Sequence, residues 1–205
     1  MSFVATDGTR LAMIENPSAY TRKERAAFIL PSKFAKILSN IVPEDWMEVE
    51  ISVNQTNILF EFDSYRLICR MIEGRYPNYR VVIPQKQPNR AVLKKADIVS
   101  ALKRVSVFCD ESSSLVVLKF DSDSLKIAAH DLDFSKSAEE TIPLQSGCNI
   151  EIGFRSSFII EMVNNIPSED IAITMSDPSK ASIFTRCDEE VRSLTYLLMP
   201  LSINY

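Results

Sequence analysis

The sequence predicts an α+β protein with antiparallel sheets, built from repeated strand-helix-strand halves. The first observation is an internal repeat. Residues 32–45 and 156–170 both run from a serine-led amphipathic helix, through Asn and Ile, to a turn rich in Pro, Glu or Asp. Upstream, residues 3–7 match residues 127–131 at the same offset of about 124 residues, which is typical of tandem related domains and too long for a solenoid repeat. The second observation is that strand-like alternation dominates the chain.

Strand patterns begin where Met47, Val49, Ile51 and Val53 alternate with polar residues, the period of a half-buried strand. Polar turns separate several of the later patterns. Further strands are expected at residues 57–62, 65–72, 114–120, 124–129, 149–154, 171–175, 182–185 and 193–199.

Three segments instead show apolar residues at helical spacing. Ser32 and Ser156 are expected to be the N-caps of the first and third helices, because a serine hydroxyl can accept hydrogen bonds from first-turn amides. The Pro-rich residues 83–88 break both patterns and predict an inter-domain linker. The three apolar stripes are Phe34, Ile37, Leu38 and Ile41; Ile98, Leu102 and Val105; and Phe158, Ile159, Met162, Val163 and Ile166.

After the linker, the order strand, helix, strands occurs twice in succession, which predicts a complete domain with two helices. Residues 90–126 have no counterpart before Met1. The chain is therefore expected to hold one complete domain preceded by the back half of another.

The composition gives no support for catalysis or for a cofactor. The four glycines are too scattered for a phosphate-binding loop, and His130 is the only histidine, which leaves no recognisable zinc site or Ser-His-Asp triad. His130 is better interpreted as a turn or strand-end residue. Cys69, Cys109, Cys148 and Cys187 form no CxxC pair and are expected to be reduced and mostly buried. With no export signal, a cytoplasmic location is expected.

The charge distribution is uneven in an informative way. The net charge is −4 and the pI about 5.2, whereas proteins that grip nucleic acid through phosphates are usually basic. Basic residues nevertheless cluster on corresponding elements of the repeat. They are either a solvated helix face or a shared basic surface, and the repetition favours the surface. The residues are Lys33 and Lys36 on the first helix, Lys94, Lys95, Lys103 and Arg104 around the second, and Arg155 before the third.

Three motifs carry a resemblance to a known family. Residues 5–12 read ATDGTRLA, residues 73–80 read EGRYPNYR and residues 196–201 read YLLMPL. In this order and spacing, beside the internal repeat, they resemble the bacterial DNA polymerase III beta subunit, or sliding clamp, over essentially the whole chain. The resemblance implies the DNA clamp fold, with three related domains per subunit and two subunits closing into a homodimeric ring.

By that resemblance, residues 1–84 are the C-terminal half of the middle domain, 85–88 the linker and 89–205 the complete C-terminal domain. The chain would then be N-terminally truncated. It should not close a ring, because the subunit contact near Val107 and Phe108 meets a first domain that is absent here. The tail continues to residues 202–205, beyond the family's usual end.

The resemblance implies a non-enzymatic processivity factor that encircles double-stranded DNA without reading its sequence. A ring needs only soft attraction to phosphate, which fits modest inner bases on an acidic body. The implied partners are the polymerase III catalytic subunit, the clamp loader and other proteins with a clamp-binding peptide. The residues implied to face the DNA are Lys33, Lys36, Lys94, Lys95, Lys103, Arg104 and Arg155.

The resemblance also implies a hydrophobic peptide-binding pocket at the junction of the middle and last domains. Small and apolar walls would bury Leu and Phe side chains of the peptide, with an arginine at the edge. Its residues would be Thr6, Gly8, Arg10, Leu11, Pro77, Val82, Phe158, Met199, Pro200 and Leu201. For each, ordinary packing between domains is the competing interpretation.

Two other functions stay open at this point. One is a peptide-binding module of clamp-like architecture with no role on DNA. The other is a hydrolase using Asp7 or Asp131, which is disfavoured because both aspartates occupy equivalent turns, where Asp accepts hydrogen bonds from amides. Uncovered strand edges also predict self-association, or disorder before about Phe28.

Overall fold

The structure is a computed structural model that describes residues 1–15, 27–42, 48–188 and 194–203. The expected turn at residues 43–45, the strand positions Met47 and Ser193, residues 16–26 and the tail residues 204–205 lie outside these ranges. Disorder before about Phe28, one of two expected outcomes, is wrong for the described N-terminal residues, because Ser2–Thr6 and Arg10–Glu15 form strands. The chain divides into two compact units, Met1–Ala19 with Tyr79–Tyr205 and Tyr20–Asn78. The predicted domain limits stay a prediction.

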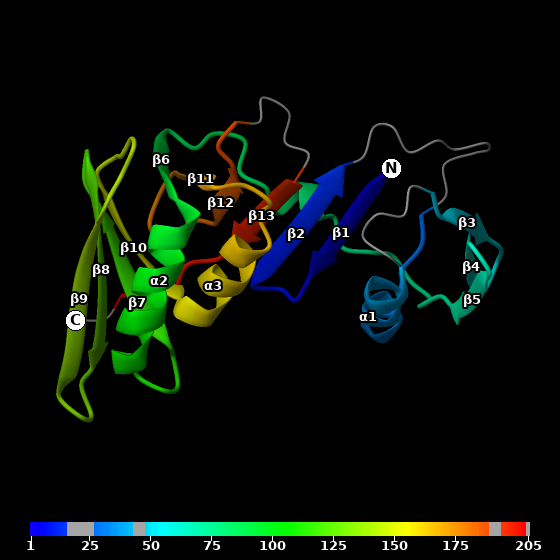
Figure 1. Ribbon diagram of the computed structural model, residues 1–205, viewed down its shortest axis with the longest axis horizontal. Helices are drawn as coiled ribbons and strands as arrows, with labels where there is room; N and C mark the ends of the chain where they lie inside the picture. The colour runs from blue at the N-terminus through cyan, green and yellow to red at the C-terminus, as the bar shows by residue number, and fades with distance from the viewer. Residues whose placement is uncertain (16–26, 43–47, 189–193, 204–205) are drawn as a thin grey trace. The chain divides into compact units, whose positions relative to one another are not determined.

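The larger unit contains two antiparallel sheets (Figure 1). The six-stranded sheet has the order β1 (Ser2–Thr6), β2 (Arg10–Glu15), β13 (Leu194–Leu198), β12 (Ser182–Arg186), β11 (Asp170–Met175) and β6 (Asn89–Lys94). The four-stranded sheet has the order β10 (Ile150–Arg155), β7 (Leu115–Phe120), β8 (Ser124–Asp131) and β9 (Lys136–Pro143).

Two helices of the larger unit lie side by side against these sheets (Figure 1). α2 (Lys95–Val105) contacts β6, β8 and β9 and continues into the 3-10 turn η2 (Ser106–Phe108), while α3 (Ser156–Asn164) contacts β10 and β13. Their apolar faces and both sheets share one core, in which the Phe154 and Phe184 rings meet edge to face with centroids 6.1 Å apart. Burial of this shared apolar surface is the main stabilising contribution.

The larger unit consists of two similar halves that exchange their first strands. The first half runs β6, α2, β7, β8, β9, and the second runs β10, α3, β11, β12, β13. β6 pairs with β11 of the second half, and β10 pairs with β7 of the first. The predicted α+β class, antiparallel sheets and repeated halves with two helices are confirmed.

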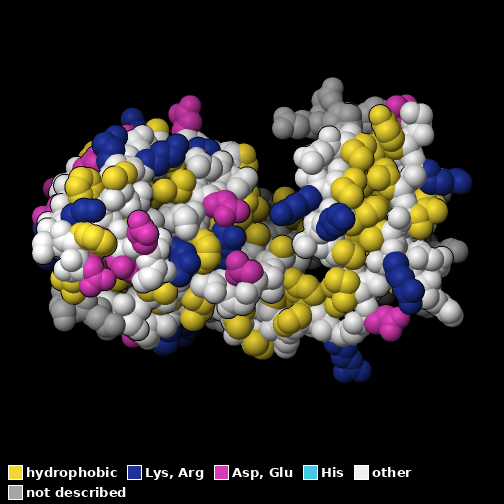
Figure 2. Space-filling view, turned by 90° about the horizontal axis from the view of Figure 1, so that it is seen from below, with side chains coloured by type: hydrophobic (Ala, Val, Ile, Leu, Met, Phe, Trp, Pro, Cys, Tyr) yellow, Lys and Arg dark blue, Asp and Glu magenta, His cyan; other side chains and the backbone are white. Residues whose placement is uncertain are grey.

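The smaller unit has one helix and one sheet. Its helix is α1 (Ser32–Ile41), and its sheet consists of β3 (Glu50–Val53), β4 (Asn57–Phe62) and β5 (Tyr65–Arg70) in that order. The Phe34 ring of α1 lies 5.7 Å from the Phe60 ring of β4, so this member of the predicted apolar stripe packs on the sheet, whereas Ile37 of the same stripe is 38% exposed. Figure 2 shows hydrophobic side chains gathered on one face of this unit.

The predicted serine caps are wrong. Pro31 and Arg155 occupy the N-cap positions, neither makes a side-chain cap hydrogen bond, and Ser32 and Ser156 are already inside their helices. The Ser156 amide instead donates to the Ser114 carbonyl at 2.9 Å, and this hydrogen bond joins the start of α3 to the residue before β7.

The predicted turn role of the two aspartates is confirmed. Asp7 Oδ1 accepts from the amides of Thr9 and Arg10, and Asp131 Oδ1 accepts from the amide of Phe134. His130 lies near the end of β8, as expected. All four cysteines are free, two buried and two half-buried, and no helix in the described ranges is long and apolar enough to cross a membrane.

Candidate functional site

The turn between β1 and β2 is held rigid by its own side chains. Thr6 Oγ1 donates to the Arg10 carbonyl at 2.7 Å and accepts from the Gly8 amide at 3.1 Å. Gly8 has φ +92°, a left-handed conformation that glycine adopts without steric cost. Together with the Asp7 hydrogen bonds, these contacts fix the backbone from which Arg10 projects.

Arg10 joins this turn to α3. Its Nε lies 2.8 Å from Asp7 Oδ2, its Nη1 lies 2.6 Å from Glu161 Oε2, and its guanidinium carbon lies 4.2 Å from the Phe158 ring centroid. Hydrogen bonds to Glu161 and then to Asp7 raise the pKa of Arg10. Burial alone would raise the pKa of Asp7, but hydrogen bonds from Arg10 and from the Thr9 amide outweigh it and lower that pKa. Arg10 therefore stays charged and covers the Phe158 ring.

The C-terminal tail joins the same turn to β10. The Met199 amide donates to the Thr9 carbonyl at 2.9 Å, and the Leu201 amide donates to the Gly153 carbonyl at 2.8 Å. The tail can approach β10 only because residue 153 is glycine, since a Cβ there would lie 2.9 Å from the Leu201 carbonyl oxygen. The tail thus crosses from the six-stranded sheet to the four-stranded sheet.

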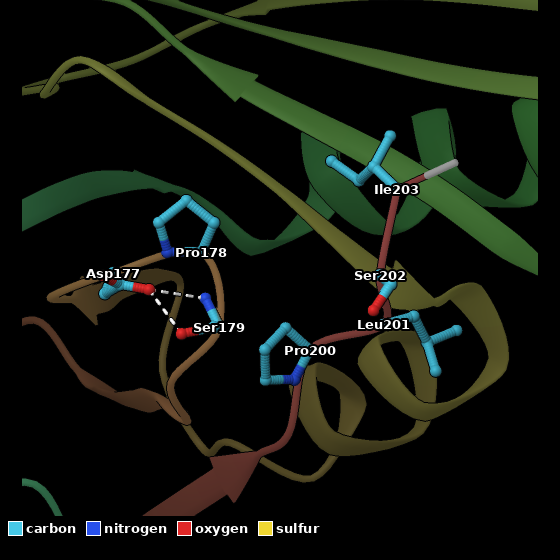
Figure 3. A pocket seen from close by; sticks show the side chains of 7 residues that line it. All are labelled: Asp177, Pro178, Ser179, Pro200, Leu201, Ser202 and Ile203. Carbon is cyan, nitrogen blue, oxygen red and sulfur yellow. Dashed lines mark hydrogen bonds between the residues drawn. The ribbon is translucent and has the colours of Figure 1, made fainter. Parts of the chain in front are cut away.

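An open cavity of about 460 Å³ adjoins the tail (Figure 3). Its walls are the Asp177–Ser179 turn between β11 and β12 on one side and Pro200 to Ile203 of the tail on the other. Asp177 Oδ1 accepts from the amide and the hydroxyl of Ser179 at 2.8 and 2.6 Å, which fixes the turn. The volume lies in the range of small-ligand sites and suits one or two apolar side chains.

The structure brings most of the predicted pocket residues together, but these residues differ in how exposed their side chains are. Met199 is 39% exposed, whereas Leu11 is buried against Leu197 in a small apolar cluster that also includes Tyr79 and Ile83. Val82 is exposed on the 3-10 turn η1 (Tyr79–Val82) beside that cluster. Pro77 belongs to the smaller unit, so its part in the pocket stays a prediction.

Arg155 contacts one of the predicted pocket residues. It ends β10, and its guanidinium carbon is 5.4 Å from the centroid of the Phe158 ring, which Arg10 also contacts. The structure therefore places Arg155 with the candidate pocket residues. Its predicted contact with DNA stays untested.

The basic side chains around α2 differ in whether they form hydrogen bonds or ion pairs within the protein. Lys95 Nζ donates to the Ile166 carbonyl at 2.8 Å, and Arg104 Nε donates to Glu140 Oε2 at 2.9 Å. Lys94 and Lys103 are exposed and make no ion pair with any described residue. On the face shown in Figure 2, basic and acidic side chains of the larger unit are interspersed.

The remaining predicted residues are exposed. Lys33 and Lys36 lie on α1 of the smaller unit. Val107 and Phe108 lie on η2 and are 75% and 39% exposed, an unusual position for apolar side chains that is compatible with a subunit contact.

Sequence reasoning missed three contributors to the site. Glu161 sits one helical turn after Phe158, a spacing that placed it on the same face and was a usable signal. Gly153 carried a weaker signal, because an isolated glycine in a strand often marks close backbone approach. The Asp177–Ser179 turn was recognised only as a separator of strands.

Comparisons with known proteins agree with this geometry. The family model of the DNA polymerase III beta subunit, C-terminal domain, matches residues 80–202, and the model of the central domain of the same subunit matches residues 1–78. A beta sliding clamp from Synechocystis sp. is 28% identical over 218 residues, covering 99% of this chain and 55% of the relative. One from Pseudomonas aeruginosa is 26% identical, covering 98% and 54%. The chain thus spans about half the length of these curated relatives.

Solved structures show the same fold. A crystal structure of the DNA polymerase sliding clamp from Pseudomonas aeruginosa superimposes with a TM-score of 0.92 at 26% identity, covering 98% of this chain and 55% of that one. The DNA polymerase III subunit beta of Borrelia burgdorferi, solved in complex with a natural product, gives 0.89 at 25% identity, covering 98% and 53%.

Proposed function

Because the chain belongs to the DNA polymerase III beta subunit family, we propose that it is part of a DNA sliding clamp. In this role it is a non-catalytic processivity factor of the replicative polymerase, acting in the cytoplasm. It tethers the polymerase, the clamp loader and other replication proteins to double-stranded DNA through short peptides. The ring itself is a property of the longer homodimeric protein, with Val107 and Phe108 at the subunit contact.

One observation carries the peptide-binding part of this proposal. The β1–β2 turn, the start of α3 and the tail, which are far apart in sequence, are tied together by the Arg10–Glu161 ion pair and by the Met199 and Leu201 amides. The result is a surface with an exposed methionine and an aromatic ring, which suits apolar anchors of an extended peptide, and two of the predicted pocket residues, Pro200 and Leu201, also line the cavity beside the tail.

The predicted division into residues 1–84, 85–88 and 89–205 is also proposed. The two matching family models support two domains in this order, but place their boundary a few residues earlier, because one ends at residue 78 and the other begins at residue 80. The β1–β2 hairpin pairs with β13, so the first segment contributes strands to the six-stranded sheet.

The peptide site predicts that this chain binds a Gln-Leu-x-Leu-Phe peptide and that Met199→Ala and Phe158→Ala each weaken binding about ten-fold, a loss near 1.4 kcal/mol. Fluorescence polarisation of a labelled peptide measures the affinity. Phe134→Ala is the matched control, because Phe134 is 69% exposed on the β8–β9 turn, outside the site. Binding that ignores both site variants would contradict the assignment.

The DNA role predicts weak, sequence-independent binding of a short duplex, with an affinity that falls steeply as salt rises. Replacing Lys94 and Lys103 together by glutamine should reduce the slope of log affinity against log salt by roughly one to two, since each phosphate contact contributes about 0.9. Fluorescence anisotropy across a salt series gives the slope. A slope that the double variant leaves unchanged would favour a peptide-binding module with no role on DNA.

A further inference from the structure

Two guanidinium groups contact the Phe158 ring, and their charges are compensated differently. The Arg10 guanidinium is paired with both Asp7 and Glu161. The Arg155 guanidinium makes no ion pair with any carboxylate in the part of the chain that the structure describes. The two arginines and the two acids balance in net charge, but both carboxylates are bound by Arg10, so the Arg155 guanidinium has no described carboxylate of its own.

No carboxylate of the described residues forms an ion pair with Arg155. This arginine is the N-cap residue of α3, and the first turn of that helix contains no acidic residue. Glu161, the acid of the same helix, is engaged by Arg10 at 2.6 Å. A helix N-terminus adds a further partial positive charge, which favours an anion brought by a ligand.

The backbone of Arg155 is fixed on two sides. Arg155 is paired with Leu115 across β10 and β7, and two residues earlier Gly153 accepts the hydrogen bond of the Leu201 amide. The aromatic ring restricts the side chain in addition. A guanidinium that is already oriented loses little conformational freedom when it binds a carboxylate through its planar fork.

We infer that Arg155 is the carboxylate receptor of the peptide site and selects ligands that carry a negative charge beside their apolar anchor. The inference rests on the proposed peptide-binding function and adds a determinant of specificity to it. The carboxylate is either an acidic side chain of the peptide or its free C-terminus, since both present the same two oxygens.

The experiment compares pairs of Gln-Leu-x-Leu-Phe peptides that differ by one charge. One pair carries Asp or Asn before the motif, a second carries Asp or Asn after it with an amidated end, and a third ends at Phe as a free acid or an amide. At least one pair should show an acid preference of about three- to ten-fold at low salt, the range of an exposed to half-buried charge-assisted contact. Arg155→Gln should abolish that preference, and Arg155→Lys should restore part of it.

The matched control is Lys119→Gln, which removes one exposed cation from β7 and should leave the ratio of acid to neutral affinity unchanged. Equal affinities for acid and neutral peptides in every pair would overturn the inference while leaving the peptide site intact. Failure of all peptides to bind would overturn both. If Arg155→Gln weakened duplex DNA binding but kept the acid preference, Arg155 would be a DNA contact and the inference would be wrong.

Discussion

Replacing Gly153 with alanine should detach the tail from β10 and weaken peptide binding by at least about ten-fold, or 1.4 kcal/mol. The new Cβ would lie 2.9 Å from the Leu201 carbonyl oxygen, 2.9 Å from Leu115 Cδ1 and 3.0 Å from Ile203 Cγ1. The Leu115 methyl can rotate away, but the Leu201 oxygen belongs to the backbone, so the tail itself must move. The hydrogen bond from the Leu201 amide is then lost.

Amide hydrogen exchange measures this displacement directly. The Leu201 amide should lose its protection in Gly153→Ala, while amides within β7 and β8 keep theirs. A double-mutant cycle provides the control: in a chain shortened to end at Pro200, the alanine should have little further effect on affinity. The same affinity loss in both backgrounds would show that the methyl group acts on something other than the tail.

Phe154→Ala should lower the free energy of unfolding of the larger unit by roughly 3–5 kcal/mol, the usual cost of removing a fully buried phenylalanine. Phe154 is 0% exposed on β10 and meets the Phe184 ring of the other sheet. The cavity would therefore open between the two sheets, where neither can shift without disturbing strand pairing. Such a loss is a large part of the stability of an ordinary domain.

Urea unfolding followed by circular dichroism measures this change. Phe134→Ala makes the same chemical substitution at a side chain that is 69% exposed, with only the Lys136 ammonium 4.8 Å from its ring centroid. Its cost should be about 1 kcal/mol or less. Comparable losses in the two variants would contradict the placement of Phe154 in the shared core.

Periodicity predicted the strands and helices whose two faces differ in burial. β4 was expected at residues 57–62 and lies there, because Ile58, Phe60 and Phe62 are buried and alternate with less buried neighbours. β9 was missed, because most residues of this edge strand are exposed or half-buried and small or charged. An edge strand with little buried surface has no alternation to detect.

The site was harder to predict because its contacts are non-local. The motif around Arg10 was recognisable, yet its partner Glu161 lies 151 positions away, and no spacing rule connects them. Arg155 was grouped with the helix lysines because it carries a positive charge and precedes the corresponding helix of the repeat. Its contact with the Phe158 ring joins residues only three positions apart, so this part of the site could have been predicted from the sequence.

The exchange of first strands between the halves has a consequence for folding. The first strand of each half pairs only with a strand of the other half, since β6 pairs with β11 and β10 pairs with β7. Because these strand pairs join residues far apart in the sequence, we expect the larger unit to fold more slowly than a protein built from successive hairpins. Unfolding of one half would therefore also remove an outer strand from the sheet of the other half, so the two halves stabilise each other.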